Sequence, residues 1–388
     1  MSAPYTGIAL VAPVSVGYTR VSEHGAPWFI GAALETMLSR TGLPKSSLDG
    51  LAVGSFTLAP DSVVTLTQYY GIEARFLENL PFGGASGIVA LRRAARAVQC
   101  GDAEVIACIG ADTHRAEGFR ELVADFSRFS VDASWPYGAA GPNLPFSLIT
   151  ARYMAQNGAT REDFGRVCVA QRANARGFPQ ALLGSKSLSM EQYLGARPIA
   201  GPLHLFDCVM PCAGAEGFLV MSEERARHAG LPYARVLAAE ERHNAFGEDD
   251  VQWRAGWNAF AADLWDRAGC GPQDMDLLET YDDYPVISML QMEGLGFCSP
   301  GEAAGFVRST PLTNDGGGLP HNTSGGQLSV GQAGAAGGFL GIVEAIRQVT
   351  GRALGQQVKD ARRAAVGGYG MINYDRGLCT AAAVLEGA

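Results

Sequence analysis

Short apolar runs alternate with longer amphipathic stretches along the first part of the chain. The apolar runs at 6–13 and 48–54 predict strands, and the helical periodicity at 28–42 predicts a helix between them. A second helical run at 86–101 leads into another apolar strand at 103–112. This alternation of strands and helices predicts an α/β layered domain.

The alternation stops at 113–200, where helical segments are richer in polar residues and arginine. We interpret this stretch as an inserted, mostly helical subdomain, followed by a late strand of the first half at 217–224. A second series of similar order then predicts two successive halves and an ancient duplication. Its expected elements are a strand at 234–241, a helix at 251–269, a strand at 276–281, helices at 283–297 and 339–351, and strands at 362–370 and 379–387.

Composition narrows the classes of function. The chain has 388 residues, of which 47% are hydrophobic and 18% charged, and its net charge is −9. A low charged fraction favours a large interior, and the absence of a basic stripe argues against binding to nucleic acid or to an anionic membrane. No apolar stretch is long enough to span a membrane, and the N-terminus lacks a basic region typical of a signal peptide. We therefore expect a cytoplasmic protein without membrane insertion.

The cysteines and glycines add two expectations. Eight cysteines are scattered, mostly among apolar neighbours, which favours reduced, buried thiols over a disulfide framework and gives no metal site. The 50 glycines predict many tight turns and close backbone contacts.

An ordered set of motifs resembles the thiolase superfamily, in particular its bacterial branch related to sterol-carrier-protein-type thiolases. The resemblance covers nearly the whole chain. The motifs are GGASGIVAL (83–91), RPIAGPLHLFDC (197–208), LLETYDDYP (277–285), GFCSPGEAAGF (296–306), LPHNTSGGQLSVGQAGAAGG (319–338) and GGYGM (367–371).

The resemblance implies the thiolase fold, with two similar βαβαβαββ halves in a five-layered α/β/α/β/α arrangement and a loop domain over the active site. It also implies acyl-CoA substrates and a homodimer, in which an edge strand near 76–82 pairs with its copy. The expected division of the chain is 1–118 for the first part of the N-terminal half, 119–200 for the inserted loop domain, 201–230 for the end of the N-terminal half and 231–388 for the C-terminal half.

The side chains that react in acyl-transferring relatives differ here in all four catalytic loops. The family's nucleophilic cysteine falls on Gly84, and Tyr281 stands at the second loop's His or Asn position. Gln332 replaces the histidine of the third loop, and Val366 replaces the second cysteine. Without a nucleophile no acyl-enzyme forms, which excludes ordinary thiolysis.

The resemblance therefore points to relatives that lack the cysteine and act as retro-aldol lyases on 3-hydroxyacyl-CoA, as in steroid breakdown, with a small OB-fold/zinc-ribbon partner protein. Coenzyme A enters as part of the substrate, and no tightly bound cofactor is expected. A second catalytic tyrosine is expected in the third loop of those lyases, where Gln332 stands. The candidate catalytic residues are Tyr281, His321 and Gln332, and the candidate substrate- or oxyanion-binding residues are Gly84, Ala85, Ser86, Gly87, Asn322, Gly325 and Gly326.

Other interpretations stay open at this point. The chain could be an acyltransferase such as an acetyl-CoA acetyltransferase that uses an unusual thiol, of which Cys298 is the best candidate. It could also be a non-catalytic acyl-CoA-binding subunit. Ser86 is interpreted as a helix N-cap rather than as a substitute nucleophile, and Asn322 as a residue that shapes its turn.

Overall fold

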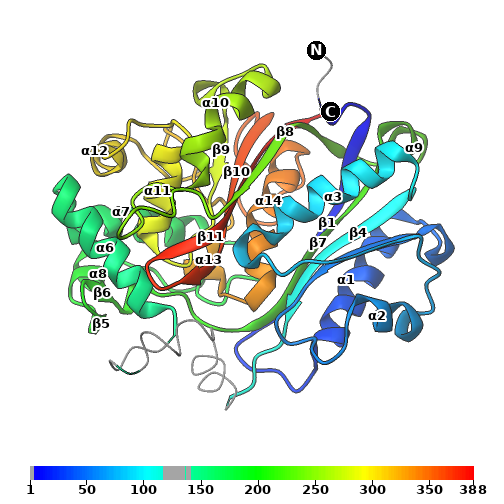
Figure 1. Cartoon of the computed structure of the whole chain (residues 1–388), viewed down its shortest axis with the longest axis horizontal. Helices are drawn as coiled ribbons and strands as arrows, with labels where there is room; N and C mark the ends of the chain where they lie inside the picture. The colour runs from blue at the N-terminus through cyan, green and yellow to red at the C-terminus, as the bar shows by residue number, and fades with distance from the viewer. Residues whose placement is uncertain (1–3, 117–135, 137–140) are drawn as a thin grey trace.

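The computed structural model describes residues 4–116, 136 and 141–388, and its centre is a nine-stranded sheet (Figure 1). The strands follow the order β3-β2-β4-β7-β1-β8-β11-β10-β9. Strands of the first half occupy one side and strands of the second half the other. Their bounds are β1 Ile8–Thr19, β2 Gly50–Gly54, β3 Phe76–Asn79, β4 Val105–Asp112, β7 Ala213–Ser222, β8 Tyr233–His243, β9 Leu277–Glu279, β10 Arg363–Asn373 and β11 Arg376–Gly387.

The two halves meet where β1 pairs with β8. This antiparallel pairing is short and runs from Ala9 opposite Arg235 to Val11 opposite Tyr233. Within each half, parallel strands lie at the outer edge and antiparallel strands at the centre: β3, β2 and β4 are parallel in the first half, and β9 and β10 in the second. The repeated order supports the duplication that the sequence predicts.

Helices form the remaining layers. Helix α1 packs on the outer face of the first half, whereas α3 and α14 share one apolar core with both halves of the sheet. Helix α10 packs on β8 and β11. The predicted thiolase-like layering is confirmed. The helices of these layers are α1 Ala26–Thr41, α2 Val63–Tyr70, α3 Ser86–Cys100, α9 Glu223–His228, α10 Gly256–Ala268, α11 Pro285–Gly294, α12 Ala303–Ser309, α13 Gly326–Val330 and α14 Gly337–Val349.

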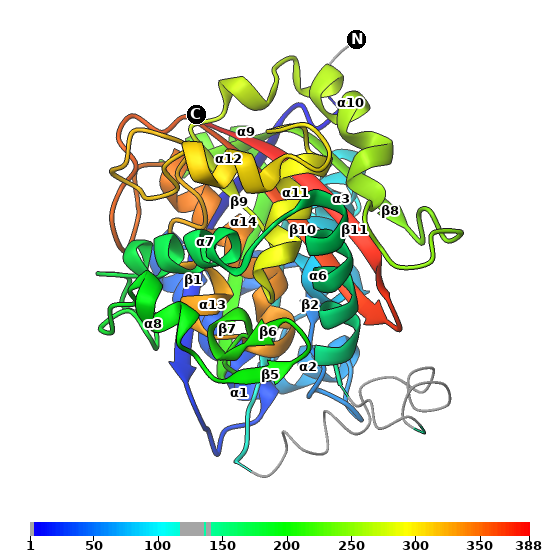
Figure 2. The same cartoon turned by 90° about the vertical axis from the view of Figure 1, so that its left-hand side faces the viewer.

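The described part of the predicted insertion is helical. It contains α6 (Asn143–Asn157), α7 (Arg161–Asn174), α8 (Met190–Leu194) and the strand β5 (Pro198–Ala200). This strand pairs with β6 (Leu203–His204), which lies just beyond the predicted limit at residue 200. Although the insertion follows β4 of the first half, it packs on α11 and α12 of the second half, through the same apolar core (Figure 2). The predicted boundary between residues 118 and 119 lies outside the described residues, and the proposed domain limits stay a prediction.

No helix of the described residues is long and apolar enough to cross a bilayer. Within the same residues, no group of three or more His, Cys, Asp or Glu side chains is placed to hold a metal ion.

Candidate active site

Two similar turns lead into the two central helices and frame the candidate site. Residues Gly83–Ala85 form a 3₁₀ turn before α3, and Gly334–Ala336 form one before α14. The first glycine of each turn has a positive φ, +53° at Gly83 and +54° at Gly334, where other residues are strained. The turns therefore occupy corresponding places in the two halves.

The family's nucleophile position, Gly84, has no room for a side chain. A Cβ atom at Gly84 would lie 2.1 Å from the carbonyl oxygen of Tyr369 and 2.2 Å from Cε2 of Tyr281. The ring of Tyr281 thus fills the space in which a catalytic thiol would project. A small cavity of about 10 Å³ remains beside the ring. Its lining includes Gly84, Glu279, Tyr281, Asn322 and Gly326.

Hydrogen bonds fix both the backbone and the hydroxyl of Tyr281. Its N–H donates to Oε1 of Gln291 at 3.1 Å, and its carbonyl accepts from Nε2 of the same side chain at 2.8 Å. Nε2 of Gln332 donates to the Tyr281 hydroxyl oxygen at 3.3 Å. Burial, followed by the charge of Asp283, raises the Tyr281 pKa well above its ordinary value. The resting residue is therefore a neutral phenol.

The structure brings Gln332 and Tyr281 together from separate loops. The backbone of Gln332 is fixed by two hydrogen bonds, from its N–H to Met210 O at 2.9 Å and from the N–H of Cys212 to its carbonyl at 3.0 Å. A primary amide donates hydrogen bonds but does not shuttle protons. Its contact is suited to holding the phenol oxygen.

His321 does not line the small cavity. It is fully buried, and its Nε2 lies 2.8 Å from Oγ1 of Thr280. Nδ1 has no hydrogen-bond partner among the described residues. Burial lowers its pKa to about 3, so the ring is neutral at physiological pH. A catalytic role for His321 stays a prediction.

The loop at 322–326 is shaped around a buried carboxylate. Asp282 accepts hydrogen bonds from the N–H groups of Gln327 at 2.9 Å and Leu328 at 3.2 Å, at the start of α13. Burial raises its pKa to about 6. A Cβ atom at Gly326 would lie 2.2 Å from the same carboxylate. Asp282 therefore requires glycine at 326 and sets the course of this loop.

Asn322 and Gly325 also have structural contacts. Oδ1 of Asn322 accepts from the N–H of Thr280 at 2.7 Å, and Asn322 itself has φ +46°. A Cβ atom at Gly325 would lie 2.4 Å from Cβ of Ala175 in the insertion. These contacts agree with the interpretation that Asn322 shapes its turn, and substrate binding by either residue stays a prediction.

The start of α3 differs from expectation in one respect. Ser86 is not an N-cap: it is the first residue of the helix, and its hydroxyl donates to the carbonyl of Leu80 at 3.2 Å. The N–H groups of Ala85 and Ser86 donate to Phe82 O and Gly83 O within the turn. Gly87 packs against Gly338, because a Cβ atom there would lie 2.4 Å from Gly338 O. An oxyanion role for Ala85 and Ser86 requires these bonds to open and stays a prediction.

No thiol replaces the missing nucleophile. All eight cysteines are free. Burial, with Glu293 and Glu302 nearby, raises the pKa of Cys298 to about 12. Cys212 lies next to the loop of Gln332, with its Sγ against the position of Gly331, and burial also raises its pKa. Neither is a reactive thiolate at neutral pH.

Two neighbours of the site were not among the sequence candidates. Tyr369 replaces one glycine of the glycine run in the family's fourth loop. This replacement is the feature of the sequence that could have indicated a residue close to the site. Its hydroxyl donates to Gln252 Oε1 at 2.5 Å and its ring stacks on Trp257. Asp283 is the other neighbour, a buried carboxyl two residues after Tyr281.

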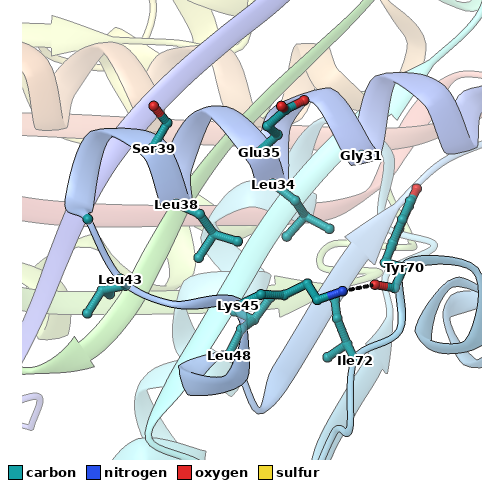
Figure 3. Close-up of a pocket in the computed structure, with 11 residues that line it drawn as sticks. Gly31, Leu34, Glu35, Leu38, Ser39, Leu43, Lys45, Leu48, Tyr70 and Ile72 are labelled. Carbon is teal, nitrogen blue, oxygen red and sulfur yellow. Dashed lines mark hydrogen bonds between the residues drawn. The ribbon is translucent and has the colours of Figure 1, made fainter.

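A wider pocket elsewhere on the molecule is lined by none of the candidate site residues. It has a volume of about 510 Å³ and lies between α1 and the end of α2 (Figure 3). Its wall is mostly apolar, and Lys45 Nζ donates to the carbonyl of Tyr70 at 2.8 Å across it. We assign the candidate active site to the Gly84–Tyr281 region instead.

Comparison with known proteins agrees with this geometry. Residues 238–380 match the family model described as "Thiolase C-terminal domain-like". A "steroid side-chain-cleaving aldolase" from Thermomonospora curvata is 32% identical over 369 residues, which cover 90% of this chain and 92% of that protein. This chain is a member of the thiolase superfamily, in its SCP2-thiolase-like aldolase branch.

Other members of the superfamily extend the comparison. A "17-hydroxy-3-oxo-4-pregnene-20-carboxyl-CoA lyase" from Mycobacterium tuberculosis is 31% identical over 359 residues, covering 88% of this chain and 91% of that protein. The solved "Ltp2-ChsH2(DUF35) aldolase" superposes with a TM-score of 0.85 at 29% identity, over 99% of this chain and 98% of that chain. As a thiolase-superfamily aldolase, the chain is a carbon–carbon lyase, and its glycine at the nucleophile position is consistent with that class.

Proposed function

We propose that this aldolase cleaves 3-hydroxyacyl-CoA thioesters by a retro-aldol reaction, without an acyl-enzyme. The single observation that carries the proposal is the filled space at Gly84, where the Tyr281 ring and the Tyr369 carbonyl exclude a nucleophilic side chain. A thioester that enters such a site cannot be transferred to the protein. It can still lose a bond between C2 and C3, because the thioester stabilises the resulting enolate.

Tyr281 is the residue we place at the reacting atoms. Its hydroxyl is neutral and is contacted by Gln332, so it can hydrogen bond either to the substrate's 3-hydroxyl or to the enolate oxygen. Gln332 holds the phenol oxygen, and His321 contacts the neighbouring Thr280. In this scheme coenzyme A is part of the substrate.

The substrate class follows from the named relatives. Two of them are named for action on steroid side chains or a pregnene carboxyl-CoA. We therefore propose a bulky, steroid-type side chain with a tertiary 3-hydroxyl as the acyl group of this enzyme's substrate. A tertiary alcohol cannot be oxidised to a ketone for thiolysis, so direct retro-aldol cleavage is the chemistry that such a group requires.

The assembly is proposed on the same basis. One solved structural relative is the "Ltp2-ChsH2(DUF35) aldolase", and we propose that this chain also works with a small OB-fold/zinc-ribbon partner. We further propose a homodimer formed through β3, which lies at the edge of the sheet and has one side unpaired among the described strands. Sedimentation at micromolar concentration should give the mass of a dimer, and a stable monomer would contradict this part.

The test of the activity is direct turnover. The chain, alone and with a co-expressed DUF35 protein, is mixed with a steroid-type 3-hydroxyacyl-CoA carrying a tertiary hydroxyl. The expected products are a ketone and a shortened acyl-CoA in equal amounts, with no requirement for free CoA. Product that forms only when free CoA is added would indicate thiolysis and overturn the proposal.

A further inference from the structure

Glu279, the last residue of β9, is a buried carboxyl that the proposed reaction does not yet use. It is 1% exposed, and it lines the small cavity together with Gly84 and Tyr281. Its Oε1 accepts a hydrogen bond from the N–H of Thr323 at 3.0 Å and lies 2.7 Å from Oγ1 of the same residue. Glu279 thus fastens the loop at 322–326 to the strand that precedes Tyr281.

The hydroxyl of Thr323 joins Glu279 to a second buried carboxyl. Its Oγ1 also lies 3.1 Å from Oε1 of Glu344, on α14. A hydroxyl has one hydrogen to donate. If both carboxyl groups were ionised, one of the two contacts would have no hydrogen of its own between its oxygens. The geometry therefore indicates a proton on at least one of the two carboxyl groups.

The neighbours of the two carboxyl groups differ in charge. Oε2 of Glu344 lies 3.4 Å from Nη1 of Arg347, and its Oε1 accepts from Nε2 of Gln348 at 2.9 Å. No cation among the described residues forms an ion pair with Glu279, and the charged groups that face it are the carboxyls of Glu344 and Asp282. Burial, followed by the charge of Glu344, raises the Glu279 pKa well above its ordinary value. Burial also raises the Glu344 pKa, but the charge of Arg347 opposes that effect.

The remaining contacts of Arg347 lead away from the cavity. Its Nη2 donates to Oγ of Ser15 at 2.8 Å, and the Ser15 hydroxyl donates to Oε2 of Glu216 at 2.7 Å. One buried cation thus serves Glu344 directly and Glu216 through a serine, and neither contact reaches Glu279. A buried charge without a partner is costly, so the proton belongs on Glu279.

We propose that Glu279 is a neutral carboxylic acid and a positioning residue of the aldolase site. Its hydrogen is donated to Oγ1 of Thr323, and the Thr323 hydroxyl donates in turn to the Glu344 carboxylate. The negative charge of the pair then lies beside Arg347, on residues that do not line the small cavity. This inference rests on the proposed retro-aldol function, in which an enolate forms beside Tyr281. A second negative charge in the cavity wall would disfavour that enolate.

The protonation states are tested without turnover, by infrared difference spectroscopy of the full chain at neutral pH. Glu279→Gln should remove one protonated-carboxyl band, whereas the matched control Glu344→Gln should remove an ionised carboxylate band. Removal of an ionised band by Glu279→Gln would overturn the proposal. Failure of Glu279→Gln to fold would also overturn it, because the amide has the size of the neutral acid and also carries no charge.

A second measurement follows the same proton during unfolding. The unfolded chain loses the Glu279 proton near the ordinary pKa of glutamate, whereas the folded chain keeps it at neutral pH, so unfolding releases one proton. The stability that this proton contributes is greatest in acid and is lost as pH rises. Between about pH 5.5 and 7.5, the unfolding constant of the wild type should therefore rise about tenfold per pH unit relative to that of Glu279→Gln. A ratio that does not change with pH would contradict a neutral Glu279.

The positioning role is tested by rescue, with kcat of the full chain and its partner. Glu279→Ala removes both contacts with Thr323, and displacement of the loop should lower kcat on the order of 10²-fold. Glu279→Gln should recover most of that loss. Equal losses in the two variants, with normal wild-type turnover, would overturn this inference alone. No turnover of any 3-hydroxyacyl-CoA by the wild type would overturn the proposed function and the positioning role with it, while the infrared bands would still decide the proton on Glu279.

Discussion

The turns before α3 and α14 have the same backbone shape but different surroundings. Both begin with a glycine at positive φ, Gly83 and Gly334. In the second turn the next residue is Ala335, whose N–H donates to Oδ2 of Asp112 at 2.7 Å. In the first turn the corresponding residue is Gly84, which faces Tyr281 and the Tyr369 carbonyl. The second turn is anchored by a carboxylate, and the first is closed by an aromatic ring.

The different neighbours of the two turns show that a duplicated element can keep its backbone shape while its function changes. Asp112 ties the second turn to the first half of the chain, since it also accepts from Ser55, Phe56 and Thr57. One buried carboxylate thus accepts from five hydrogen-bond donors, and it fixes the second turn to the first half of the chain. The first turn has no such anchor, and its glycine leaves space that Tyr281 occupies. We infer that chemistry remains at the first turn only.

The largest effect is expected at the residue that closes the first turn. Tyr281→Phe keeps the ring against Gly84 and removes only the hydroxyl. If that hydroxyl contacts the substrate or the enolate, kcat should fall by roughly 10²–10⁴-fold while stability changes by on the order of 1 kcal/mol. Steady-state kinetics with a 3-hydroxyacyl-CoA, together with thermal unfolding, measures both. Wild-type kcat in this variant would remove Tyr281 from the mechanism.

The next largest effect is expected from a methyl group added to the first turn, compared with one removed from the second. Gly84→Ala places a Cβ atom about 2 Å from Tyr281 and the Tyr369 carbonyl, so we expect a loss of roughly 3 kcal/mol from overpacking, and loss of activity. Ala335→Gly at the corresponding position of the second turn should cost only about 1 kcal/mol and leave kcat unchanged. Denaturant unfolding of both variants gives the two values. Equal costs would mean that the turns are equivalent.

A smaller effect on stability is expected at the anchor of the second turn. Asp112→Asn keeps the size of the side chain but replaces one carboxylate oxygen by an NH2 group, which cannot accept from the donors that face it. We expect a loss of about 1.5–3 kcal/mol of unfolding free energy with kcat nearly intact. A variant that unfolds normally but is inactive would place chemistry at the second turn as well.

The smallest effect is expected from alkylation of the thiols. Cys100 is exposed and should react with iodoacetamide. The other thiols have pKa values raised by burial and should react slowly. Because no thiol is placed at Gly84, the enzyme should retain most of its activity. Rapid inactivation with one labelled cysteine that acyl-CoA protects would favour an acyltransferase.

The fold was largely predictable because its elements have strong periodic patterns. The strands β4 and β8 are apolar runs, and α3 has a clear amphipathic face, so each was predicted within a few residues. The first strand was predicted at 6–13, whereas β1 continues to Thr19. Helix α2 was missed because its eight residues are short and two of them, Val64 and Tyr69, expose large apolar side chains to solvent. The packing of the insertion on the second half could not be predicted, since it depends on contacts between distant segments.

The site was predictable in its residues and less so in their geometry. The motif comparison placed Gly84, Tyr281 and Gln332 in separate loops, and the structure brings these three together. It could not show that the Tyr281 ring fills the space at Gly84, because that depends on the fold of two loops against each other. Ser86 was wrong as an N-cap because a serine next to a helix start satisfies the same local pattern whether it caps or lies in the first turn.

The absence of an acyl-enzyme is tested most simply by the mass of the intact protein during turnover. The chain and its partner are mixed with a steroid-type 3-hydroxyacyl-CoA, quenched at times shorter than one turnover and later, and analysed by mass spectrometry. We expect ketone and shortened acyl-CoA to appear while the protein mass stays unchanged at every time. A protein that gains the mass of an acyl group, and loses it as product forms, would contradict it.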